Sequence, residues 1–208
     1  MNAAQHHWDA VYRDKPDAQT SWFRAHLDTS LRLIDALQLP VTAPVIDIGG
    51  GRATLVDDLL ARGYVDVSVL DLAEPALAAA RARLGADARV NWRVADVIEA
   101  DLPRVHYALW HDRAVFHFLI DAAARTRYVA QAARAVRAGG YAIIATFAPD
   151  GPQQCSGLPV RRYDADALAT AFAPAFARVS ATREEHHTPW GSVQPFTYVV
   201  LQRTESSS

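Results

Sequence analysis

The pattern of apolar and polar positions predicts a series of short buried strands. Runs of apolar, often β-branched side chains predict strands at 45–48, 65–72, 90–97, 107–110 and 141–147. The last of these runs is nearly continuous, which is typical of a parallel strand buried on both faces. Near the end of the chain, 177–185 and 196–202 are expected to pair as a long hairpin around the turn at 188–191.

Apolar residues at helical spacing separate these strands. They predict helices at 5–14, 27–39, 53–60, 74–84, 122–137 and 164–172. Because strands alternate with helices, the sequence predicts an α/β fold with a mostly parallel seven-stranded sheet, helices on both faces and an antiparallel hairpin at the C-terminal end.

The chain has 208 residues, which suits one domain with a full core. We therefore expect a single domain over 1–208. Within it we expect a helical, aromatic segment at 1–40, a Rossmann-like core at 44–203 and a disordered tail at 204–208.

The turn after the first strand is rich in glycine. Gly49, Gly50 and Gly51 follow directly on the strand and precede a helix, an arrangement typical of a nucleotide-binding unit. Two features depart from a dinucleotide fingerprint: Thr54 stands where a third glycine is needed, and Asp47 ends the strand with a charge that would oppose a pyrophosphate. Asp47 suits a ligand that carries an ammonium group.

Acids are also expected at the ends of the second and third strands. Asp71 lies 20 residues after Gly51, the spacing at which a carboxylate binds the hydroxyl groups of an adenosine ribose. Asp96 ends the third predicted strand, where it can accept a hydrogen bond from an adenine amine.

These motifs, from Val45–Ala53 through Asp71 and 95–97 to 139–144, resemble those of the class I S-adenosylmethionine-dependent methyltransferases. Ala53 replaces the usual third glycine of that family. The resemblance runs from about residue 5 to residue 203. It is strongest to compact bacterial methyltransferases with an aromatic N-terminal segment. It implies S-adenosyl-L-methionine as the cofactor, bound by a set of residues from four strand ends: Asp47, Gly49, Gly50, Gly51, Asp71, Leu72, Asp96, Val97 and Trp110.

The segment after the fourth predicted strand carries candidate catalytic groups. His111 is our first candidate for a general base and His117 our second, because an imidazole can take a proton near neutral pH. If His111 is the base, His111→Ala should lower turnover with little effect on cofactor affinity. A thiol acceptor would need no strong base.

Residues expected near the methyl acceptor come from three parts of the chain: Trp8, Tyr12, Trp22, Arg113 and Cys155. The N-terminal aromatic residues either cap the core or form a lid over cofactor and acceptor. Cys155 lies in the long stretch at 148–159 that we expect to be a loop, and is either a small buried residue or a thiol facing the acceptor.

Composition excludes several classes of function. The net charge is −2 without a basic cluster, which argues against nucleic-acid binding. A single cysteine excludes an internal disulfide and a cysteine-based zinc site, and the adjacent His186 and His187 should point to opposite faces of a strand, so we expect no metal. We find neither a signal peptide nor an apolar run of membrane-spanning length, so a cytoplasmic monomer or weak homodimer is expected.

The sequence therefore favours methyl transfer to a small-molecule acceptor through an oxygen, nitrogen or sulfur nucleophile. A protein lysine methyltransferase is the alternative, supported by a fainter likeness to enzymes that act on translation elongation factors. An NAD-dependent oxidoreductase and a non-catalytic cofactor-binding module are the remaining alternatives.

Overall fold

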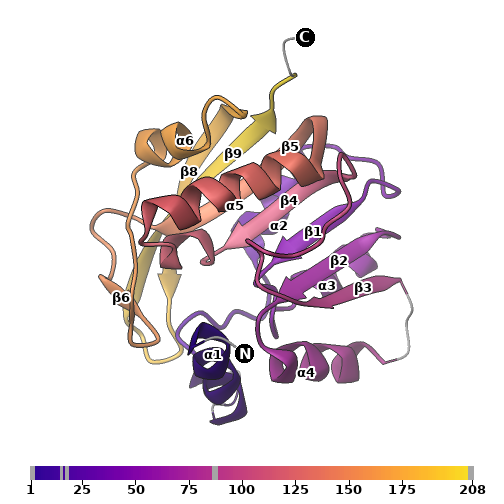
Figure 1. Ribbon diagram of the computed structural model, residues 1–208. Coiled ribbons are helices and arrows are strands. Elements are labelled where there is room, and N and C mark those ends of the chain that lie inside the picture. Colours follow the sequence, from indigo (N-terminus) through magenta and orange to yellow (C-terminus); the bar gives the residue numbers. More distant parts are fainter. Residues whose placement is uncertain (1–2, 15, 17–18, 86–88, 206–208) are drawn as a thin grey trace.

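The computed structural model describes residues 3–14, 16, 19–85 and 89–205. The end of the tail predicted to be disordered, 206–208, lies outside these residues. Seven strands form one sheet: β1 (Val45–Ile48), β2 (Val67–Asp71), β3 (Val90–Val94), β4 (Tyr107–Arg113), β5 (Val136–Phe147), β8 (Phe176–His187) and β9 (Val193–Arg203). Their order across the sheet is β3-β2-β1-β4-β5-β9-β8 (Figure 1).

The sheet is parallel from β3 to β5, and β9 pairs antiparallel with both β5 and β8. The predicted fold class is confirmed: a mostly parallel seven-stranded sheet with a C-terminal antiparallel hairpin. The strand order reverses between β1 and β4, which places their carboxyl ends at the switch point where ligands bind in such sheets. The register there sets Asp47 beside His111.

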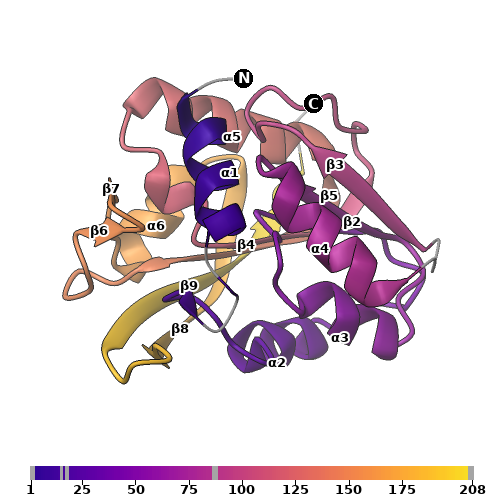
Figure 2. The same cartoon turned by 90° about the horizontal axis from the view of Figure 1, so that it is seen from below.

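The helices cover both faces of the sheet. They are α1 (Ala3–Asp14), α2 (Asp28–Ala36), α3 (Leu55–Ala61), α4 (Glu74–Leu84), α5 (Ala122–Ala135) and α6 (Ala165–Phe172). Figure 2 shows α2 and α3 on one side of the sheet and α5 on the other. The first helix, α1, lies away from the sheet and packs beside α4.

Each face of the sheet has its own apolar core. On one face, Leu31 and Ile34 of α2 pack with Leu59 of α3 and with the sheet. On the other, α5 and α6 bury Tyr128 and Phe172. Both cores contain side chains from the central strands, because alternate residues of a strand point to opposite faces.

Three of the differences from the sequence predictions have a clear structural reason. The fourth strand continues to Arg113, since His111 and Asp112 pair with Ile143 and Ile144 of β5. Helix α5 ends at Ala135, because Val136 is extended and pairs with Tyr107. The expected loop at 148–159 contains a small hairpin of β6 (Gln154–Cys155) and β7 (Leu158–Pro159).

Substitution of Phe172 tests the core under α5 and α6. The ring is fully buried and lies 4.9 Å from the ring of Phe116 and 6.0 Å from that of Phe176. Phe172→Ala should lower the free energy of unfolding by about 3–5 kcal/mol, since a cavity remains. Denaturant unfolding measures the loss. Val179→Ala, at an exposed position of β8, is the control and should change it by less than about 1 kcal/mol. Equal effects would show that this core is not packed as described.

Candidate functional site

A cavity of about 410 Å³ opens at the carboxyl ends of the parallel strands. Its walls come from the ends of β1, β2 and β4, from the segment after β3 and from the β6–β7 hairpin, with α1 on the outer side. Asp47 and Asp71 line it from the ends of β1 and β2, and Arg113 and Cys155 line it from the end of β4 and the β6–β7 hairpin. The ends of these strands therefore converge on one cavity.

The glycine turn is shaped by close contacts that leave no room for side chains. A Cβ atom on Gly50 would lie 2.6 Å from Asp47 Oδ2 and from Val69 Cγ1. Gly51 has a φ of +47°, and a Cβ atom there would lie 2.6 Å from the hydroxyl of Tyr12 and 3.1 Å from Asp71 Oδ2. The turn therefore brings bare backbone to the cavity between two carboxylates.

Asp71 is buried at the end of β2 and held by backbone amides. Its Oδ1 accepts a hydrogen bond from the N–H of Ala73 at 2.8 Å, and the N–H groups of Gly51 and Leu72 also donate to the carboxylate. Burial is the largest cause that raises the pKa of Asp71, to about 7, and the nearby Asp47 adds to it. Burial thus makes this carboxyl group costly to ionise, and a ligand that donates hydrogen bonds would relieve that cost.

Asp47 is held by a buried chain of hydrogen bonds. Its Oδ1 lies 2.7 Å from Nδ1 of His111, and Nε2 of His111 lies 2.9 Å from Oγ of Ser30 on α2. Because the carboxylate only accepts, Nδ1 carries the proton, and in the neutral imidazole Nε2 accepts from the Ser30 hydroxyl. Both ring nitrogens of His111 are therefore hydrogen-bonded to other side chains.

The residues that the sequence predicts to hold an adenine also line the cavity. Asp96 and Val97 follow β3, two and three residues after its last residue, Val94. Asp96 Oδ1 accepts from the N–H of Ile98 at 3.0 Å, which fixes the turn. Leu72, from the end of β2, lines the cavity beside them.

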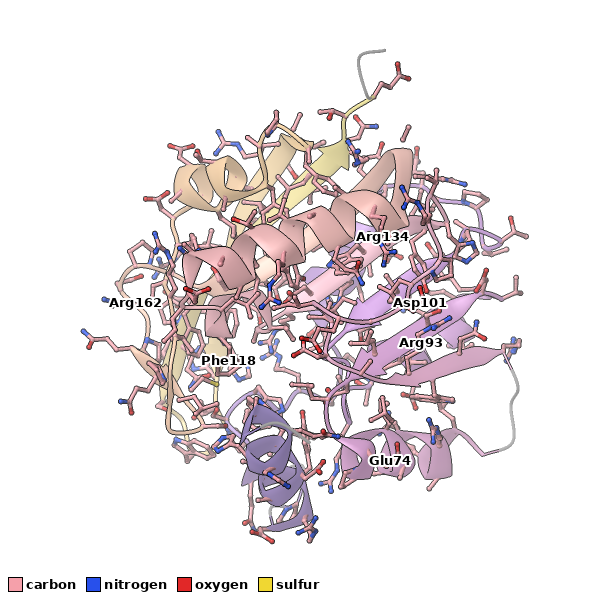
Figure 3. The ribbon with its side chains drawn as sticks, in the orientation of Figure 1. Glu74, Arg93, Asp101, Phe118, Arg134 and Arg162 are labelled. Carbon is pink, nitrogen blue, oxygen red and sulfur yellow. The ribbon has the colours of Figure 1, made fainter. Side chains whose placement is uncertain are left out.

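Four aromatic rings form a roof on the outer side of the cavity. Trp8 contacts Trp22 at 5.9 Å and Phe118 at 5.2 Å between ring centroids, both edge to face, and Tyr12 meets Trp22 at 6.0 Å. Figure 3 shows Phe118 between the main body and α1. The roof thereby joins α1 to the segment that follows β4, and all four residues line the cavity.

Arg113 lies under this roof, at the end of β4. Its Nε donates to the hydroxyl of Tyr198 at 2.9 Å, and its guanidinium carbon sits 4.4 Å from the centre of the Phe196 ring. Its Nη2 lies 3.7 Å from Glu184 Oε1. Cys155 lines the same part of the cavity, and burial raises the pKa of its thiol to about 11, so the thiol is neutral.

Two predicted site residues lie elsewhere. Trp110 faces the α5 side of the sheet, fully buried, where its Nε1 donates to the hydroxyl of Tyr128 at 2.9 Å. The expectation that Trp110 contacts the cofactor is therefore corrected: alternation along β4 points it away from the cavity. His117 is fully buried behind the lining and its Nδ1 accepts from the N–H of Phe147 at 3.4 Å. Burial lowers its pKa to about 3, so the ring is neutral.

Sequence reasoning missed two supporting residues. Ser30 completes the chain at Asp47 but lies 81 residues from His111, with no local signal. Asp112 accepts from the N–H groups of Val115 and Phe116 and from the hydroxyl of Tyr128, which shapes the turn η2 (Phe116–Phe118). An aspartate three residues before a turn is a sequence signal that could have identified Asp112.

The burial of Asp71 predicts a pH-dependent stability. Its pKa of about 7 in the folded chain exceeds the ordinary 3.8, so the folded state keeps a proton that the unfolded chain releases. Relative to Asp71→Asn, the ligand-free protein should therefore lose about 2–3 kcal/mol of unfolding free energy between pH 5 and pH 8. Denaturant unfolding of both proteins at the two pH values measures it. Parallel pH profiles would contradict the assignment.

Comparisons with known proteins agree with this geometry. The model of a methyltransferase-domain family matches residues 45–140, from β1 into β5. No curated protein matches. Among the part of the chain that the structure describes, no helix is long and apolar enough to cross a membrane.

Solved structures share the fold over nearly the whole chain. One comes from work on the conversion of a disulfide bond into a thioacetal group during echinomycin biosynthesis, with 22% identity, a TM-score of 0.78, and 98% of this chain and 94% of that chain covered. Another is the 1,6-didemethyltoxoflavin-N1-methyltransferase of Burkholderia thailandensis with bound 1,6-didemethyltoxoflavin and S-adenosylhomocysteine. It is 23% identical, has a TM-score of 0.71, and the match covers 98% of this chain and 85% of that chain.

A third structure is the N-methyltransferase NodS of Bradyrhizobium japonicum in complex with S-adenosylhomocysteine. It is 13% identical, has a TM-score of 0.72, and the match covers 97% of this chain and 99% of that chain. At these identities the structures show the shared fold. Together with the sequence match over residues 45–140, a little less than half of the chain, they support a class I S-adenosylmethionine-dependent methyltransferase.

Proposed function

We propose that the protein methylates a small, largely apolar molecule bound beneath the aromatic roof. The observation that carries this proposal is the division of one cavity into two parts. Carboxylates and bare backbone line the part at β1 and β2, while Trp22, Phe118 and Cys155 line the part under α1. The first part suits a polar cofactor and the second suits an apolar acceptor.

The residues at the polar part fit S-adenosylmethionine. Asp47 and the backbone of Gly49–Gly51 would hold the amino-acid end, Asp71 and Leu72 the ribose, and Asp96 and Val97 the adenine. The narrow glycine turn and the buried, amide-held Asp71 support this assignment. When bound, the cofactor would supply an activated methyl group on its sulfonium.

The protein's contribution is then to orient the acceptor and to exclude water. Ring contacts from α1 close the outer side of the cavity, so the acceptor would be held in line with the donor. The geometry favours a positioning role for His111, since Asp47 and Ser30 occupy both of its ring nitrogens. His117 lies behind the lining with its Nδ1 bonded to the backbone.

The engagement of His111 and the burial of His117 favour a small acceptor over a lysine side chain. A lysine ammonium must lose a proton before it can accept a methyl group, and the two histidines expected to act as bases are both engaged or buried. Among the structural neighbours, the toxoflavin enzyme was solved with its small-molecule acceptor, which supports the proposal by analogy.

The acceptor class can be tested with labelled S-adenosylmethionine. Purified protein is incubated with the metabolite, protein and RNA fractions of a cell extract, and methylated metabolites are sought by a gain of about 14 mass units. We expect the label in a metabolite. Label found only in protein or RNA would overturn the small-molecule proposal.

His111→Ala separates positioning from base catalysis. Loss of its hydrogen bond would leave the Asp47 carboxylate buried with one partner fewer, so affinity for S-adenosylhomocysteine should fall about tenfold or more. Calorimetry measures the affinity, and His106→Ala, at a partly exposed histidine directly before β4, is the matched control. Unchanged affinity with lower turnover would instead support a base.

The aromatic segment should order when ligand binds. Backbone amides of 3–14 and 19–23 should exchange more slowly with solvent once S-adenosylhomocysteine is added, because Trp8, Tyr12 and Trp22 line the cavity it would fill. Hydrogen-exchange mass spectrometry provides the measurement. Equal protection with and without ligand would show that the segment is a fixed part of the core and not a lid.

A further inference from the structure

Arg113 carries a buried hydrogen-bond donor that the fold leaves unused. The Arg113 side chain is 6% exposed, lines the cavity, and its Nη2 makes no hydrogen bond to any described residue. Its Nε is already bonded to Tyr198, and Phe196 covers one face of the guanidinium. A buried N–H without a partner costs stability, so a group that accepts from Nη2 when the site is filled would relieve this cost.

The donor belongs to the acceptor part of the cavity. Arg113 comes from the end of β4, under the aromatic roof, and shares the lining with Cys155, Phe118 and Leu158. The acids expected to hold the cofactor stand at the ends of β1 and β2 and after β3. A group that reached this guanidinium in the filled cavity would therefore belong to the methyl acceptor.

The charges around Arg113 decide what kind of atom it meets. Glu184 Oε1, 3.7 Å from Nη2, balances the guanidinium charge without a hydrogen bond, and both side chains are buried. The groups nearby are neutral: burial raises the pKa of Cys155 and lowers those of His117 and His186. Arg24 also lines the cavity but pairs at the surface with Asp28.

An anionic acceptor would thus bring an uncompensated negative charge into this part of the cavity, beside Glu184. An uncharged carbonyl oxygen would accept from Nη2 and leave the Arg113–Glu184 pair balanced. The aromatic rings of Trp22 and Phe118 suit a flat ring system attached to that oxygen.

We propose that the methyl acceptor is a small aromatic or heteroaromatic molecule that presents an uncharged carbonyl oxygen to Nη2 of Arg113. This inference rests on the proposed function, and it makes Arg113 the residue that selects a neutral carbonyl compound over a carboxylate. Methylation itself would occur elsewhere on the acceptor.

Three probes of similar size test the selection directly on the wild-type protein. Acetophenone has a neutral carbonyl, ethylbenzene has none, and benzoate has a carboxylate. With S-adenosylhomocysteine present, ligand-observed NMR should show acetophenone binding at least about tenfold more tightly than either of the others. Benzoate or ethylbenzene binding as tightly as acetophenone, or no binding of acetophenone, would overturn the inference.

Variants then assign the preference to Arg113. Arg113→Met combined with Glu184→Gln removes both charges of the buried pair, so the fold is not left with an unpaired carboxylate. It should abolish the preference for acetophenone over ethylbenzene. Arg183→Met, which breaks an exposed pair between β8 and Asp150 in the turn after β5, should preserve it. Preference retained in the double variant would remove Arg113 from acceptor recognition.

Calorimetry with S-adenosylhomocysteine distinguishes a failure of the proposed function from a failure of the carbonyl inference alone. If the wild type fails to bind it, the proposed function fails. If it binds and the probes show no preference, the carbonyl inference alone fails. Affinity for S-adenosylhomocysteine should be the same in the wild type and the double variant, since Arg113 lies in the other part of the cavity.

Discussion

The burial of two carboxylates at adjacent strand ends is the constraint on which the site depends. Asp47 and Asp71 are each less than one-tenth exposed, and they stand on β1 and β2 on either side of the glycine turn. Such groups are tolerated only because backbone amides hold Asp71 and His111 holds Asp47. The same arrangement leaves oxygen atoms facing a cavity, ready for a ligand that brings hydrogen-bond donors and positive charge.

This constraint explains several features around it. Glycine is needed at 50 and 51 because side chains there would collide with the two carboxylates or with Tyr12. Ser30 on α2 fixes the far side of His111, which ties a helix that precedes the first strand to the switch point of the sheet. The aromatic roof and Arg113 then complete the opposite part of the cavity, where a buried ion pair stands in place of the two carboxylates. One cavity thereby offers two chemically different environments.

Local sequence patterns were enough to predict the sheet, the glycine turn and the acids, because each depends on residues that are close along the chain. Placement of the fourth strand was harder. The polar residues His111, Asp112 and Arg113 look like a loop, yet pairing with β1 and β5 extends the strand through them. Their burial depends on partners such as Ser30 and Tyr128 that only the folded chain brings near. Trp110 and His111 point to opposite faces for the same reason, since the register of β4 decides which of them meets the cavity.

We propose that Asp71 and its neighbours bind S-adenosylmethionine through the ribose. Titration calorimetry of the protein and of Asp71→Ala with S-adenosylhomocysteine, with NAD as a comparison ligand, tests it most directly. We expect S-adenosylhomocysteine to bind and NAD not to bind. Asp71→Ala should weaken binding about tenfold to a hundredfold while the fold is retained. Equal affinity in the folded variant, or preferential binding of NAD, would contradict it.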